Sequence, residues 1–109
     1  MNKVLVVAAH PDDEVLGCGA TLAKHNHIGD KINILFMTDG LSSRKKINKT
    51  DLLKRKNSTI KSSKILGIKK IINLEFPDNA MDKLPLLKII KKIENVIDSF
   101  KPNIIYTHH

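Results

Sequence analysis

The chain has 109 residues and a formal net charge of +8 at pH 7, and 41% of its residues are hydrophobic. This length suits one globular domain, residues 1–109, and no apolar run approaches the roughly 20 residues that cross a bilayer. We therefore expect a cytoplasmic protein without a membrane span or a secretory signal, and the single Cys18 excludes an internal disulfide.

Four short apolar segments alternate with longer amphipathic segments, which is typical of repeated βα units and a parallel sheet. The predicted strands do not alternate strictly between apolar and polar residues, so we expect helices on both faces of the sheet. The sequence therefore predicts an α/β fold, a Rossmann-like three-layer sandwich with a mainly parallel sheet. Its predicted strands cover residues 3–8, 31–37, 70–74 and 103–107.

Three helices are predicted between the strands, over residues 13–27, 51–66 and 86–100. Gly29 and Gly67 follow the first two helices, and glycine is a common residue just past a helix end. The second helix has serines where a buried face would normally carry aliphatic side chains. The residues expected to face the core are Leu16, Ala20, Ala23 and His27 in the first helix and Leu86, Ile90, Ile93, Ile97 and Phe100 in the third.

Lysine supplies most of the positive charge, in a chain with 19 Lys and Arg against 11 Asp and Glu. A basic surface attracts nucleic acid, but stacking on bases also needs aromatic side chains, which make up only 4% of this chain. We expect a solvated lysine-rich surface and no nucleic-acid partner.

The run from His10 to Glu14 follows directly on the first predicted strand and is the most informative segment. Pro11 keeps His10 out of the helical region, and the turn behind it exposes the carboxylates of Asp12 and Asp13 at the carboxyl edge of the sheet. Imidazole and carboxylate groups suit zinc or another divalent metal. The alternative is that these acids only cap the first helix, but helix capping does not explain the histidine.

Right-handed crossovers bring the carboxyl ends of successive parallel strands to one edge of the sheet. Residues that follow the other strands can therefore approach the His10 segment although they are distant in sequence. These residues are Asp39, Asp78 and His108.

The segment from Ala8 to Glu14, followed by Leu16-Gly17-Cys18-Gly19, resembles the signature of the PIG-L/LmbE-like N-acetylglucosaminyl deacetylases. Further segments up to His108 are similar to bacterial members. The resemblance implies a zinc-dependent hydrolase that removes the acetyl group from an N-acetylated amino sugar or its conjugate. It also implies that His10 and Asp13 bind the metal and that Asp12 is the general base.

The resemblance further implies a third histidine ligand beyond the last predicted strand, whereas this chain stops at His109. We therefore expect a chain truncated after the fourth strand, equivalent to the N-terminal half of a family member, in which His108 is a possible additional site residue. By position, Arg55 and Asp78 match the residues that hold sugar hydroxyls. Ser58 stands where the family has an acid, so Arg44 is a rival to Arg55, and Asp78 can instead be a turn residue.

Two other functions remain open at this point. The chain can be a non-catalytic regulatory module in which an acidic pair binds magnesium, as in receiver-like domains, although His10-Pro11 has no place in that scheme. It can also be an inactive α/β fragment that binds metal weakly at most.

Overall fold

The computed structural model of the chain describes residues 1–11, 13–38, 49–76 and 85–108. Its sheet is parallel, with the strand order β3-β2-β1-β4, so β1 lies between β2 and β4. The strands are β1 (Lys3–Ala8), β2 (Lys31–Thr38), β3 (Lys70–Phe76) and β4 (Ile104–Thr107).

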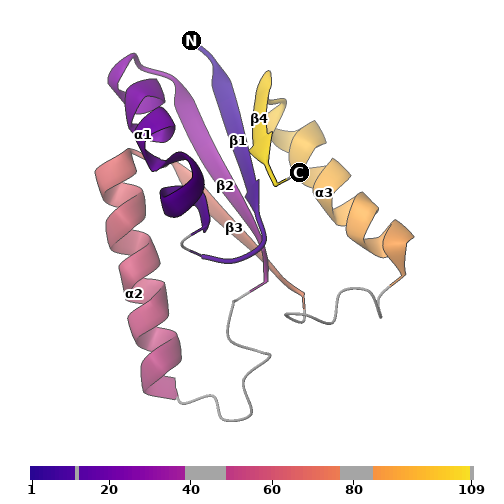
Figure 1. Ribbon diagram of the computed structural model, residues 1–109. Helices are drawn as coiled ribbons and strands as arrows, with labels where there is room; N and C mark the ends of the chain where they lie inside the picture. Colours follow the sequence, from indigo (N-terminus) through magenta and orange to yellow (C-terminus); the bar gives the residue numbers. More distant parts are fainter. Residues whose placement is uncertain (12, 39–48, 77–84, 109) are drawn as a thin grey trace.

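Helices cover both faces of this sheet. The helices α1 (Asp13–His27) and α2 (Lys49–Leu66) lie on one face, and α3 (Leu86–Phe100) lies on the other (Figure 1). The expected three-layer α/β fold is therefore confirmed. Among the described residues, no helix is long and apolar enough to cross a membrane.

The two faces of the sheet carry separate apolar clusters. On the α1 and α2 face, Val6 and Ile34 of neighbouring strands pack with Leu22 of α1. On the α3 face, Leu5 and Leu35 pack with helix residues that include Phe100. The central strands are therefore buried on both sides, which explains why their sequences are almost continuously apolar.

The expected core face of α1 is wrong at Ala20, Ala23 and His27, which are exposed, and the prediction for the Leu16 side chain lies outside the described residues. The helix instead buries a stripe that passes through a kink at Cys18, where φ is −147° and ψ is 23°. Two polar residues contribute to this stripe, so counting apolar residues alone selects the wrong face. The stripe consists of Glu14, Cys18, Leu22 and His25.

The other two helices bear out the expectations only in part. In α2, Ser63 is buried but Ser58 is exposed, so the serine-rich inner face is real and narrower than expected. In α3, the C-terminal half packs on the sheet, whereas Leu86 is 70% and Ile90 39% exposed. The apolar stripe of α3 therefore extends beyond the surface that the sheet covers.

A polar network joins α1 to the strands near the amino edge of the sheet. The backbone N–H of Asn2 donates to Asp30 Oδ1 (2.8 Å), and His25 Nδ1 lies 2.6 Å from Asp30 Oδ2. His25 Nε2 lies 2.8 Å from the hydroxyl of Tyr106 in β4. The pKa of Asp30 is held below its ordinary value mainly by the hydrogen bond from the Asn2 backbone. The hydrogen bond with the His25 side chain is the next largest cause.

Asp30→Asn should lower the free energy of unfolding at pH 7, and the loss should shrink as the pH falls below about 4. Because the folded-state pKa of Asp30 lies below the unfolded-state value, ionised Asp30 stabilises the fold above that value. The contribution disappears as the pH falls through the folded-state pKa. Urea denaturation at a series of pH values measures the difference, with Asp98→Asn on the exposed side of α3 as the control. An unchanged loss at pH 3 would contradict this account.

Candidate functional site

The site is built around the peptide of Ala9, just beyond the end of β1. Its carbonyl oxygen accepts the backbone N–H of Thr38 (2.9 Å) and the Thr38 hydroxyl (3.0 Å), both from β2. Its N–H donates to His108 Nε2 (3.1 Å), which follows β4. Both neighbouring strands therefore fix the backbone immediately before His10.

His10 and Asp13 form a compact pair across the turn that leads into α1. The His10 N–H donates to Asp13 Oδ2 (3.0 Å), and the Asp13 N–H donates back to the His10 carbonyl (3.2 Å). His10 Nδ1 lies 3.4 Å from the same Asp13 oxygen, and each side chain remains about one third exposed. The turn therefore delivers an imidazole nitrogen and a carboxylate oxygen to one point, both accessible from solvent.

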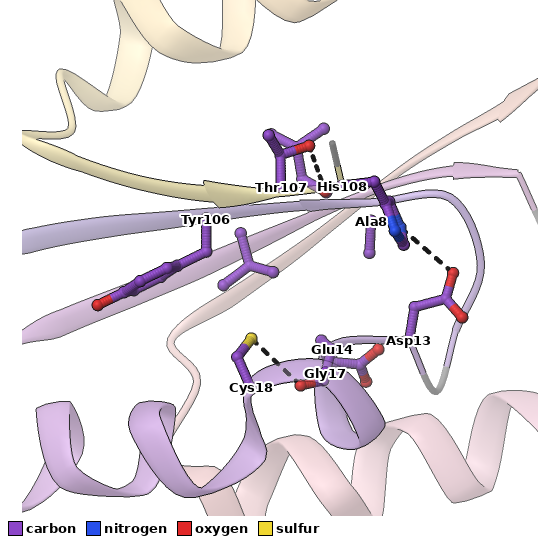
Figure 2. A pocket seen from close by; sticks show the side chains of 10 residues that line it. Ala8, Asp13, Glu14, Gly17, Cys18, Tyr106, Thr107 and His108 are labelled. Carbon is purple, nitrogen blue, oxygen red and sulfur yellow. Dashed lines mark hydrogen bonds and ion pairs between the residues drawn. The ribbon is translucent and has the colours of Figure 1, made fainter.

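His108 approaches the pair from β4, and its Nε2 is 3.5 Å from Asp13 Oδ2 (Figure 2). An ion pair there requires a proton on Nε2, whereas the hydrogen bond from Ala9 requires Nε2 to be unprotonated. The bond from Ala9 is the shorter and directional one, so we assign Nε2 as its acceptor. His108 therefore lies beside Asp13, with its Nε2 lone pair engaged by the backbone N–H of Ala9.

The His10–Asp13 pair fits two ligands of a divalent ion. Ligand bonds of about 2.0–2.1 Å in a tetrahedral zinc site separate the donor atoms by about 3.3 Å, close to the 3.4 Å between His10 Nδ1 and Asp13 Oδ2. Asp13 Oδ1 has no hydrogen-bond partner within the described part of the chain. The described residues contain no group of three His, Cys, Asp or Glu side chains arranged to hold a metal.

A pocket of about 220 Å³ extends from the Asp13 and His108 side chains along β1 and β4 (Figure 2). Gly17 and Cys18 of α1 line one wall, and a Cβ atom at Gly17 would meet no described atom within 4 Å. Tyr106 lines the far end, with its hydroxyl directed away from Asp13. The pocket therefore places a small, largely apolar space beside the candidate ligand Asp13.

The structure brings together only some of the predicted site residues. His10, Asp13 and His108 meet, whereas Arg55 is half-buried in α2 and is not one of the described residues that line the pocket. The predictions that involve Asp12, Asp39, Arg44 and Asp78 lie outside the described residues.

Sequence reasoning missed three residues that shape this site. Thr38 holds the Ala9 carbonyl, Tyr106 ends the pocket, and Glu14 is buried at 2% exposure in its wall. The threonine at the end of a strand adjacent to β1 was the available signal, because its hydroxyl can reach a neighbouring carbonyl. For Tyr106 and Glu14, the sequence pattern offered no comparable signal.

Comparison with known proteins identifies the family. The model of the family PIG-L, described as GlcNAc-PI de-N-acetylase, matches residues 5–109. The diacetylchitobiose deacetylase of Thermococcus kodakarensis is 34% identical over 96% of this chain and 40% of its own length. This chain therefore spans well under half of that relative.

Two solved structures share the fold. The N,N'-diacetylchitobiose deacetylase from Pyrococcus horikoshii has a TM-score of 0.81 and 28% identity, covering 95% of this chain and 39% of that one. The 4-carboxy-2-hydroxymuconate hydratase of Pseudomonas putida has a TM-score of 0.78 and 19% identity, covering 96% of this chain and 46% of that one. Because this fold also serves a hydratase, the fold alone does not define the reaction.

Native Cys18 should react slowly with iodoacetamide, because burial, and secondly the charge of Glu14, raise the pKa of its thiol. We expect alkylation at pH 8 to be at least about 10-fold slower in the folded chain than in urea. Glu14→Gln removes the smaller cause and should accelerate labelling of the folded chain. The two proteins should react at equal rates when unfolded, and equal rates in the folded state would exclude an effect of Glu14.

Proposed function

Because the chain belongs to the PIG-L family, we propose that it carries the metal-binding turn of a hydrolase that removes acetyl groups from N-acetylated amino sugars. The observation that carries the proposal is the 3.4 Å approach of His10 Nδ1 to Asp13 Oδ2, at the edge where α/β folds place their chemistry. We further propose that zinc, or another divalent ion, is the metal held by these two residues.

When bound, such an ion supplies Lewis acidity, which activates water and polarises the acetamide carbonyl. Asp12, adjacent to the ligand Asp13 in sequence, is proposed as the general base that takes a proton from the attacking water. Asp13 itself accepts the His10 backbone N–H and would also bind the metal, which would make it a poor proton acceptor. The two neighbouring carboxylates therefore take different roles.

An amino sugar is the proposed substrate class, because the Thermococcus and Pyrococcus relatives are both diacetylchitobiose deacetylases by name. Arg55 and Asp78 remain proposed as contacts to sugar hydroxyls. The side chain of Arg55 begins on α2, on the same face of the sheet as α1, which is compatible with that role. His108 is proposed as an additional site residue, because its Nε2 lies 3.5 Å from the Asp13 carboxylate.

Zinc titration of the chain by calorimetry tests the metal site directly. We expect His10→Ala and Asp13→Ala each to weaken zinc binding by more than about 10-fold, since each removes a donor atom. His27→Ala, at the exposed end of α1, is the matched control and should leave binding unchanged. Equal affinity in all four proteins would refute the site, and uniformly weak binding would favour the inactive-fragment alternative.

Asp12→Asn tests the general base separately from the metal. The amide keeps the size of the side chain but cannot accept a proton, so acetate release from N,N'-diacetylchitobiose should fall by at least about 100-fold. Zinc affinity should stay within about 3-fold of the wild-type value, because Asp12 is not a proposed ligand. Undiminished acetate release by this variant would remove Asp12 from the mechanism.

A further inference from the structure

A second cavity, of about 660 Å³, lies at the end of the sheet opposite to the His10–Asp13 pair. It is a groove between the C-terminal half of α3 and the beginnings of β2 and β3. None of the described residues that line it is acidic. The lining residues that matter for its chemistry are Lys31, Asn33, Lys70, Asn95, Ser99 and Phe100.

Lysines begin three neighbouring strands at this end of the sheet. Lys3 and Lys31 are the first residues of β1 and β2 and are paired in register, and Lys70 is the first residue of β3. The ammonium groups of Lys3 and Lys31 each lie 5.9 Å from the centre of the Phe100 ring. Like charges on adjacent strands repel one another, so an anion in the groove would relieve this repulsion.

Asn33 provides an independent indication of a ligand. It is paired in register with Lys70, faces the groove and is only 5% exposed. Its side-chain Oδ1 is buried and has no hydrogen-bond partner among the described residues. A buried carbonyl oxygen of this kind is costly unless a donor reaches it, and a hydroxyl group of a ligand is such a donor.

We propose that this groove binds a phosphorylated sugar. The phosphate lies between Lys31 and Lys70, a sugar hydroxyl donates to Asn33 Oδ1, and Asn95 and Ser99 offer further polar groups. Phe100, which also lines the groove, offers an apolar contact to the C–H groups of the sugar ring. The proposal does not depend on the reaction at the His10–Asp13 edge, since the two sites share no residue.

Calorimetry with glucose 6-phosphate, glucose and inorganic phosphate separates binding of the phosphate group from binding of the sugar. Because charge and hydroxyl contacts act together, glucose 6-phosphate should bind at least about 10-fold more tightly than either fragment. Equal affinity for glucose 6-phosphate and inorganic phosphate would mean an adventitious ion only and would overturn the proposal.

Asn33→Leu gives a readout that a purely structural role would not produce. The substitution removes the unsatisfied carbonyl at similar volume, so the melting temperature should rise by about 4 °C or more. Binding of glucose 6-phosphate should nevertheless weaken by about 3- to 10-fold, because the acceptor is gone. Unchanged binding in this variant would overturn the assignment of Asn33.

Lys70→Gln tests the contact with the phosphate, because it removes the charge of an exposed residue and leaves the buried residues unchanged. We expect affinity for glucose 6-phosphate to fall by about 5-fold or more. Lys64→Gln removes the same charge from the exposed surface of α2, on the other face of the sheet, and should change affinity by less than about 2-fold. If both variants lose affinity equally, net charge alone explains the binding and the groove is not the site.

Discussion

The peptide of Ala9 is the constraint on which the candidate site depends. It is held from one side by Thr38, the last residue of β2, and from the other by His108 after β4, so three strands must be paired correctly before it is fixed. The next residue is His10, and its backbone N–H in turn orients Asp13. The chemistry at this edge is therefore positioned by the sheet rather than by the turn alone, as expected for sites on rigid elements.

Strong local signals made much of the fold predictable. The buried strands are continuous apolar runs, and Gly29 and Gly67 adopt the positive φ angles, 89° and 73°, that suit residues just past a helix end. The approach of His10 to Asp13 was also predictable, because a proline-containing turn at a strand end leaves few ways to arrange them. The roles of Asp12, Arg55 and Asp78 stay predictions.

The features that the sequence did not reveal are long-range polar contacts. His25 faces inward because its two ring nitrogens form hydrogen bonds with Asp30 and Tyr106. Tyr106 lies 81 residues further along the chain. Hydrophobic periodicity carries no information about such a partner, and it therefore placed the core face of α1 incorrectly. The burial of Asn33, whose Oδ1 has no hydrogen-bond partner among the described residues, was not predicted either, because a single asparagine in an otherwise apolar strand does not show which face it occupies.

The edge position of β4 links the accuracy of folding to the integrity of the site. This strand has four residues and, in the described structure, pairs only with β1. Tyr106 and His108 are two positions apart and share a face, so a slip of one residue would turn both to the other side of the sheet. The hydrogen bond between His25 and Tyr106 therefore favours the observed register of β4 on β1. In this register the imidazole of His108 lies beside Asp13.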